Sequence, residues 1–311
     1  MNVFLFPGQG SQEIGMASDL LKSDQPSRDL VRRASDRVKA DLERICLRGP
    51  ERELLRTKHL QPLLVCVCLG YLRHLRERGV GPALVLGHSL GEITALAAAG
   101  SISFEAAVDV AAERGELMEA ATARTGGGMI AVISTEREKI LQWLKETLPP
   151  ERLALANDNA PGQLVLSGDL AALEQAAQFV SRERLGRCRR LPVAGAWHTP
   201  LLADARLRFE SWLASVDFRA PRVPVLFNAS GAIAGKPEEI RRLVARNIVE
   251  PVHWRSSMER LKQAKPSALF EIGPGRVLSG LARANGLDDR IPLYNVNSLR
   301  GAERTVQHSG L

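Results

Sequence analysis

The sequence is poor in cysteine and in aromatic residues. Four cysteines stand among its 311 residues, at positions 46, 66, 68 and 188, and they form neither a CxxC pair nor the spacing of a disulfide framework. That usage is typical of a reduced, cytoplasmic chain. Aromatic residues make up 5% of the chain, so we expect a core built from aliphatic side chains.

Long apolar runs are absent as well. The longest extends from Pro62 to Leu72, which is too short for a membrane span, and it contains Gly70. The chain opens directly on a strand-like run, Val3–Phe6, with no basic segment before an apolar one. We therefore expect no membrane association and no signal peptide.

The formal net charge of +7 favours acidic partners or phosphorylated ligands. Basic residues are scattered among acidic ones, and no helix-turn-helix, zinc-finger or RNA-binding aromatic pattern accompanies them. We expect an acidic protein or a nucleotide-bearing substrate as partner, and no nucleic acid.

Strand-like and helix-like segments alternate along most of the chain, which predicts an α/β fold with a mostly parallel sheet. Between residues 126 and 197 the order becomes β-α-β-β-α-β, the ferredoxin-like arrangement. We therefore predict a large domain from residues 1–125 and 198–300, with a small domain of residues 126–197 inserted into it. The polar segment 301–311 is predicted to be a frayed tail.

A nucleophile elbow is the first chemical motif. The G-x-S-x-G run Gly87–Gly91 follows the apolar strand Ala83–Leu86 and opens an alanine-rich helix, the strand–turn–helix context that the motif requires. Glycines allow the tight turn, and the helix N-terminus directs N–H groups toward developing negative charge. Ser89 is thus a candidate nucleophile and the N–H of Leu90 a candidate oxyanion donor. A turn that merely links strand and helix is the alternative.

A second glycine-rich loop, Gly8–Gln12, closes the first strand. Ligands of open α/β sheets bind at this edge, so the main-chain N–H of Gln9 is a candidate for the second oxyanion donor. A dinucleotide-binding loop and a simple turn are the alternatives, although the GxGxxG spacing of the former is absent.

Taken together, six motifs resemble those of malonyl-CoA:acyl carrier protein transacylases and of polyketide synthase acyltransferase domains. The resemblance extends from Val3 to about Leu281 and implies a hydrolase-like core with a ferredoxin-like insertion. The motifs are Phe6–Gln12, Gly87–Glu92, Glu113–Gly115, Asn159–Gln163, Ala196–His198 and Gly273–Gly275.

The resemblance implies a reaction as well as a fold. A malonyl or related carboxyacyl group moves from coenzyme A to the phosphopantetheine thiol of an acyl carrier protein, by ping-pong kinetics through an acyl-serine. Coenzyme A thioester and carrier protein are the expected partners. We expect a monomer that needs no metal and no cofactor of its own.

Among six histidines, His198 falls on the family's base position, from which a neutral imidazole takes the serine proton and returns one to the leaving thiolate. His88 adjoins the nucleophile, but its side chain should point away from the elbow. In this family a main-chain carbonyl near a Gln or Asn orients the base. Asn247 stands in that place here.

Arg114 is the clue to the substrate. It lies on the apolar stripe of a helix predicted over Phe104–Ala121, capped by Ser103. An arginine on an inward face needs an anionic partner. A structural salt bridge is one reading; the resemblance implies the other, two-pronged binding of the malonyl carboxylate, which suits a guanidinium.

Asn157 and Asn159 precede Pro161-Gly162, and the resemblance places them on a loop at the rim of the cleft; a plain turn is the alternative. The segment before His198 is nearest to the malonyl-type pattern, with Trp197 in place of the usual Phe and Thr199 in place of Ser. Because of these two differences, the resemblance defines the reaction more closely than it defines the acyl group.

Three other functions remain open. A trans-acting polyketide acyltransferase would differ in acyl choice, and an editing acyl hydrolase would use Ser89 and His198 but release the acyl group to water. A catalytically silent partner of a multienzyme complex is the third. Arg114 argues against a neutral acyl group, and the complete set of motifs argues against a silent protein.

Overall fold

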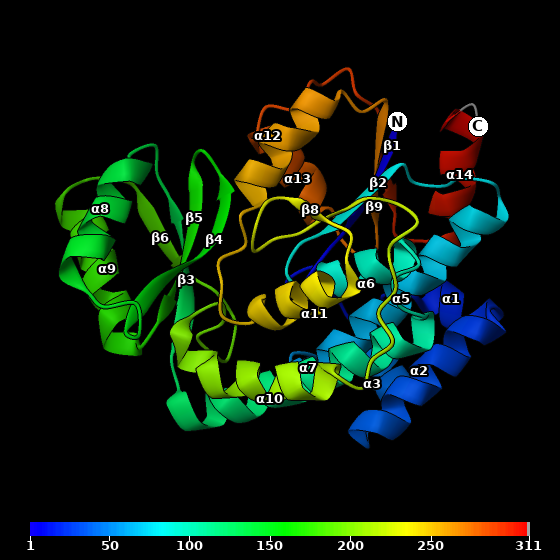
Figure 1. Ribbon diagram of the computed structural model, residues 1–311, viewed down its shortest axis with the longest axis horizontal. Coiled ribbons are helices and arrows are strands. Elements are labelled where there is room, and N and C mark those ends of the chain that lie inside the picture. Colours follow the sequence, from blue (N-terminus) through cyan, green and yellow to red (C-terminus); the bar gives the residue numbers. More distant parts are fainter. Residues whose placement is uncertain (310–311) are drawn as a thin grey trace.

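The strands form two separate sheets in the computed structural model, which describes residues 1–309 (Figure 1). Within that range the larger sheet has six strands in the order β10-β9-β1-β2-β7-β8. All its pairings are parallel except that between β7 and β8. The strands are β1 (Asn2–Phe6), β2 (Leu84–Gly87), β7 (Val225–Leu226), β8 (Ile233–Ala234), β9 (Ala268–Ile272) and β10 (Leu293–Val296).

Helices bury both faces of this sheet, as a parallel sheet requires. Val3 and Leu5 of β1 pack toward α12 and α13, whereas Phe4 and Phe6 face the cluster that contains α5 and α6. The helices of this unit are α1 (Ser18–Ser23), α2 (Gln25–Val38), α3 (Leu42–Arg48), α4 (Glu51–Leu54), α5 (Thr57–Glu77), α6 (Gly91–Ala98), α7 (Phe104–Thr125), α10 (Ala203–Leu213), α11 (Pro237–Arg246), α12 (Trp254–Ala264), α13 (Val277–Ala284) and α14 (Leu299–Ser309), with a 3-10 turn at Pro200–Leu202.

Among residues 1–309, no helix combines the length and the apolar character needed to cross a membrane. The α/β class and the mostly parallel core predicted from the sequence are confirmed.

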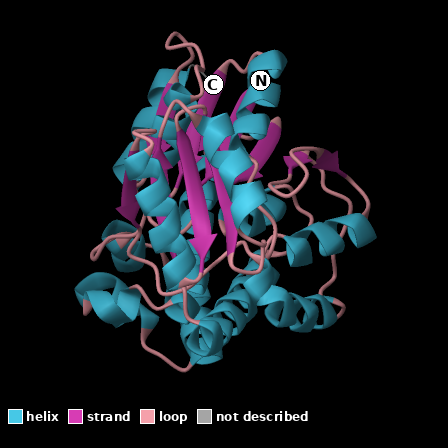
Figure 2. Ribbon diagram, turned by 90° about the vertical axis from the view of Figure 1, so that its left-hand side faces the viewer, coloured by secondary structure: helices cyan, strands magenta, loops and turns pink. Residues whose placement is uncertain are grey.

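The smaller sheet is antiparallel, in the order β4-β5-β3-β6, and belongs to the unit whose side is turned toward the viewer in Figure 2. Its chain order is β3 (Gly128–Ile133), α8 (Arg137–Thr147), β4 (Leu153–Ala160), β5 (Gln163–Gly168), α9 (Leu170–Arg182) and β6 (Arg187–Arg190). The helices and the sheet share an apolar cluster of their own. This is the β-α-β-β-α-β order that we predict; the exact domain boundaries, residues 126 and 197, stay a prediction.

The edge strand β4 of the smaller sheet is hydrogen-bonded to a segment of the large unit at Val252. The N–H of Asp158 donates to the carbonyl of Val252 at 3.0 Å, and the N–H of Val252 donates to the carbonyl of Ala156 at 2.8 Å. Main-chain hydrogen bonds thus cross between the two units here and fix β4 relative to the segment that follows α11.

The expected frayed tail is wrong for most of its length. Residues 299–309 form α14, while residues 310 and 311 lie outside the described residues. Ala302 and Thr305 are buried, and the N–H of Leu299 donates to Asp19 Oδ2 at 2.6 Å. The segment is polar overall, but its apolar residues lie on one face of an amphipathic helix, and that face is buried.

The turn between β2 and α6 is pressed against β1. A Cβ on Gly91 would lie 2.0 Å from the carbonyl oxygen of Phe6, and a Cβ on Gly87 would lie 1.9 Å from the carbonyl carbon of Gly91. Backbone atoms occupy both places, so a methyl group has no room unless the strand moves.

We therefore expect Gly87→Ala to lower the free energy of unfolding by roughly 3 kcal/mol or more, because overpacking against backbone is not relieved by side-chain rotation. Gly81→Ala is the matched control, since no atom lies within 4 Å of its added Cβ. Thermal unfolding of both variants tests this. Equal stability of the two variants would contradict the packing described for the turn.

Candidate active site

Ser89 lies on the turn that follows β2, in the left-handed backbone region, with φ of 51°. Its Oγ is 2.8 Å from Nε2 of His198. Its main-chain N–H donates to Oδ1 of Asn228 at 2.6 Å. A non-glycine residue in this region is strained, and such strain is retained where the surroundings over-determine it, often at functional sites. The elbow geometry predicted from the sequence is present.

His198 is held from behind by main-chain carbonyls. The ring atom Nδ1 lies 3.0 Å from the carbonyl oxygen of Glu250, and the main-chain N–H of His198 donates to the carbonyl of Ile248 at 3.1 Å. Since a carbonyl only accepts, Nδ1 carries the proton, and Nε2 is free to accept from the hydroxyl of Ser89. Burial and the nearby Arg114 guanidinium lower the pKa of His198 to about 3, so the ring is neutral near pH 7.

Arg114 is 1% exposed and comes from α7, whose N-cap Ser103 accepts a hydrogen bond from the N–H of Ala106, as predicted. Its guanidinium donates from Nη1 to Gln61 Oε1 at 2.9 Å and from Nη2 to Asn247 Oδ1 at 2.8 Å.

The same Nη2 of Arg114 lies 3.3 Å from Ser89 Oγ. Among the described residues no carboxylate forms an ion pair with Arg114; its partners are neutral amides and the hydroxyl. The structural salt bridge considered as an alternative is therefore absent from the part of the chain described. Burial lowers its pKa to about 10, which still leaves it charged at neutral pH.

Glu92, in the first turn of α6, is a buried carboxyl group whose role sequence reasoning missed. It is 2% exposed. Its carboxylate accepts from the N–H of Asn228 at 2.7 Å and from Nδ2 of Asn247 at 3.3 Å. Burial raises its pKa to about 8, opposed by these donors and by Arg114. The available signal was a single carboxylate in an otherwise uncharged helix.

The loop after β1 packs against the elbow, since a Cβ on Gly8 would lie 2.5 Å from the carbonyl oxygen of His88. The side-chain oxygen of Gln9 accepts from Nε2 of Gln61 at 3.1 Å. Gln9 and Leu90 are thereby brought to the same corner as Ser89, while their oxyanion roles stay a prediction. Gln61 and Asn228 were missed because nothing in the sequence marks these amides.

Asn157 and Asn159 lie within β4 and are each 6% exposed, so they are not on a loop. The strand continues past Asn157 through two register shifts against β5. Asn159 Oδ1 is 2.8 Å from Nε2 of His88, and Asn157 bridges to Val252. His88 thus points away from Ser89, toward the small sheet.

An apolar cleft of about 360 Å³ opens onto His198 between the two units. One wall comes from α8 and β4, and the other from Pro200, Val249 and Pro251. The wall residues on the side of the small sheet are Leu141, Leu144, Lys145, Leu148, Pro150, Leu153, Ala154 and Leu155.

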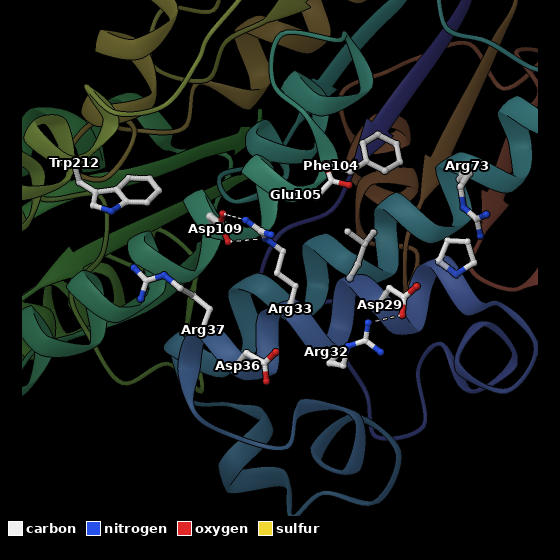
Figure 3. A pocket seen from close by; sticks show the side chains of 12 residues that line it. Asp29, Arg32, Arg33, Asp36, Arg37, Arg73, Phe104, Glu105, Asp109 and Trp212 are labelled. Carbon is white, nitrogen blue, oxygen red and sulfur yellow. Dashed lines mark hydrogen bonds and ion pairs between the residues drawn. The ribbon is translucent and has the colours of Figure 1, made fainter.

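A groove of about 960 Å³ between α2, α5 and α7 lies away from this site (Figure 3). The four arginines that line it are already paired, as Figure 3 shows for Arg33 with Asp109 and for Arg32 with Asp29. The other two pairs are Arg37–Glu113 and Arg73–Asp24. Because a carboxylate is paired with each of these arginines, this groove is not a candidate site for binding an anion.

Within residues 1–309 there is no cluster of three or more His, Cys, Asp or Glu side chains suited to hold a metal. The side chains that meet at the corner are a serine hydroxyl, a neutral imidazole and a guanidinium.

Comparison with known proteins agrees with this geometry. The model of the acyl transferase domain family matches residues 3–290, and the chain belongs to that family. It is 34% identical to the malonyl CoA-acyl carrier protein transacylase of Bacillus subtilis, over 90% of this chain and 89% of the relative. It is 35% identical to a polyketide biosynthesis malonyl CoA-acyl carrier protein transacylase of the same organism, over 90% of this chain and 96% of the relative.

Solved structures are similar along nearly the whole chain. A malonyl-transacylase in complex with a type II polyketide synthase acyl carrier protein superimposes with a TM-score of 0.92 at 32% identity, covering 98% of this chain and 99% of that one. An acyl-carrier-protein S-malonyltransferase from Burkholderia pseudomallei gives 0.90 at 30% identity, covering 98% and 99%. The family resemblance seen in the sequence is confirmed.

We expect the ring of His198 to stay neutral down to pH 5, because a lowered pKa shifts protonation to more acidic solution than the ordinary value near 6.5. Nitrogen chemical shifts of the imidazole, followed from pH 8 to pH 5, measure this directly. His198→Ala identifies the signal. Titration of His198 between pH 6 and pH 7 would contradict the burial and the charge environment described for it.

Proposed function

We propose that this protein transfers a malonyl group from coenzyme A to the phosphopantetheine thiol of an acyl carrier protein through an acyl-serine at Ser89. The observation that supports this best is the guanidinium of Arg114. It is buried and has amide partners where a carboxylate would be expected, and it lies 3.3 Å from Ser89 Oγ. A carboxylate on the acyl group supplies the missing anion.

In the first half-reaction Ser89 Oγ attacks the thioester carbonyl while His198 Nε2 takes the hydroxyl proton. The negative charge that forms on the carbonyl oxygen is stabilised by the N–H groups of Gln9 and Leu90. When the carbon–sulfur bond breaks, His198 gives its proton to the coenzyme A thiolate. In the second half-reaction His198 takes the proton of the carrier thiol, the thiolate attacks the acyl-serine, and Ser89 regains its proton.

Asn247 and the carbonyl of Glu250 orient the groups that do this work. The carbonyl fixes Nδ1–H of His198 at 3.0 Å, and Asn247 fixes Arg114 at 2.8 Å. A neutral base is what the first step needs, and the lowered pKa of His198 keeps it neutral. Asn159 holds the ring of His88 beside the nucleophile, and Asn157 bridges to Val252 near the carbonyl that orients the base.

The proposal names two partners, the coenzyme A thioester and an acyl carrier protein. The net charge of +7 suits an acidic carrier, and the apolar cleft at His198 suits the carbon-rich arm that both thioesters share. The chemistry calls for no metal and no cofactor held by this chain. The protein acts as a monomer in the cytoplasm, without nucleic acid or membrane.

The acyl-enzyme is the first test. Addition of malonyl-CoA should add one malonyl mass to the intact protein, and holo-carrier should remove it with formation of malonyl-carrier. Ser89→Ala should abolish the increment, whereas Ser230→Ala, an exposed serine on the loop after β7, should keep it. An increment in Ser89→Ala would exclude this nucleophile. Loss of the label to water at the same rate with and without carrier would instead establish an acyl hydrolase.

Acyl choice is the second test. Arg114→Ala should lower the rate of acylation by malonyl-CoA about a hundredfold or more, as truncating one partner of a buried charge pair does. Acylation by acetyl-CoA should be unchanged or faster. Arg114→Lys should restore little, because an ammonium makes no two-pronged contact.

Arg124→Ala is the matched control, since Arg124 is an exposed arginine of the same helix. Wild-type preference for acetyl-CoA, or an equal loss of both substrates in Arg114→Ala, would assign Arg114 a structural role.

A further inference from the structure

Glu92 is the buried acid of the site that the proposed mechanism does not use. All eight residues of α6 are buried, and Glu92 is the ionisable one among them. Its carboxylate makes two contacts that lead in different directions. One is the N–H of Asn228 at 2.7 Å, and the other is Nδ2 of Asn247 at 3.3 Å.

The contact with Asn247 decides which way that amide points. Both oxygens of Glu92 accept hydrogen bonds here, as an ionised carboxylate does above its pKa of about 8, and a guanidinium only donates them. Asn247 stands between the two, with Nδ2 toward Glu92 and Oδ1 toward Arg114 Nη2 at 2.8 Å. The reverse orientation would set donor against donor at Arg114, so Glu92 and Arg114 together admit one orientation.

Arg114 also donates in the opposite direction, away from Asn247. Its Nη1 donates to Gln61 Oε1 at 2.9 Å, and Gln61 Nε2 donates to Gln9 Oε1 at 3.1 Å. Two chains of hydrogen bonds thus start at the guanidinium of Arg114, one ending at Glu92 and the other at the loop after β1. Each bond in such a chain depends on the orientation of the one before it.

The contact with Asn228 reaches the nucleophile itself. The main-chain N–H of Asn228 donates to Glu92. The side chain of Asn228 contacts the elbow: its Oδ1 accepts from the main-chain N–H of Ser89 at 2.6 Å, and its Nδ2 donates to the carbonyl of Gly87 at 2.6 Å. The same carboxylate therefore anchors both the elbow and the arginine that points at it.

We propose that Glu92 is a positioning residue that fixes the amide of Asn247, aims Arg114 at Ser89 and thereby sets the preference for carboxylated acyl groups. The part about acyl preference rests on the proposed function. The part about the orientation of Asn247 and Arg114 rests on geometry alone.

Glu92→Gln, assayed at pH 9 where the wild-type carboxylate is ionised, tests this with almost no change in volume. The variant has one acceptor where the carboxylate has two, so its amide keeps either Asn228 or Asn247 but not both. If the nitrogen of the introduced amide faces Nδ2 of Asn247, two hydrogen-bond donors oppose each other. Rotating the Asn247 amide relieves that contact, but it then sets Nδ2 against the guanidinium of Arg114, which also only donates. We expect acylation by malonyl-CoA to fall roughly tenfold to a hundredfold, with a much smaller change for acetyl-CoA.

A second substitution should repair the first. In Glu92→Gln with Asn247→Asp, the amide introduced at position 92 donates to one oxygen of the carboxylate introduced at position 247, and the other carboxylate oxygen accepts from Arg114. The oxygen of the introduced amide remains for the N–H of Asn228. We expect the double variant to be faster than either single variant, because Asn247→Asp alone sets two carboxylates face to face.

The third measurement does not depend on the reaction. In the acyl-free enzyme the Nη–H signals of Arg114 should be in slow exchange, and Glu92→Gln should broaden them while the double variant restores them. The proposal is overturned if Glu92→Gln keeps the wild-type ratio of malonyl to acetyl rates with unchanged Arg114 signals. It is overturned too if both rates and the melting temperature fall together and the double variant gives no recovery.

If the proposed function is wrong, these experiments give a different set of results. Wild type would then show no preference for malonyl-CoA, and the claim about acyl preference would fall with it. The Arg114 signals and the recovery of Ser89 acylation by the double variant would still decide whether Glu92 positions the arginine.

Discussion

The constraint on which the site depends is the burial of one positive charge without a carboxylate in contact. Arg114 is 1% exposed, and its guanidinium is held by the amide oxygens of Gln61 and Asn247. An amide oxygen orients a guanidinium but does not neutralise it, so the field of Arg114 acts on its surroundings. It contributes to the low pKa of His198 and opposes the rise in the pKa of Glu92. Burial and this cation together keep the base neutral, and the cation favours an anion beside the serine.

The fold supplies the rigidity that this arrangement needs. Four separate parts of the chain meet at the end of β2: the loop after β1, α5 with Gln61, α7 with Arg114, and the segment 247–252. That last segment orients His198 through the carbonyls of Ile248 and Glu250 and then bridges to β4 of the small sheet. The position of the small sheet and the orientation of the base are therefore mechanically linked.

The sequence predicts the parts of this site whose chemistry is local. The elbow at Ser89 is visible because glycines and a strand–turn–helix order are required in one short stretch, and the structure brings His198, Arg114, Gln9 and Asn247 to it. Their catalytic roles stay predictions.

What escapes prediction depends on contacts between distant segments. Gln61 and Asn228 matter only because Arg114 and Ser89 fold against them, 53 and 139 residues away in sequence. The same holds for α14, whose polar sequence becomes a helix because one face packs on the core, and for Asn159, which the register shifts of β4 keep in the strand.

The central claim is that the charge of Arg114 is completed by the carboxylate of the acyl group. The most direct measurement is a crystal structure of the malonyl-enzyme, trapped at low temperature in the absence of carrier. The account predicts an ester on Ser89 Oγ, with both oxygens of the malonyl carboxylate on the guanidinium of Arg114, while Asn247 and Gln61 keep their contacts with it. A malonyl carboxylate that points into the apolar cleft, with Arg114 still bound to its amides alone, would contradict it.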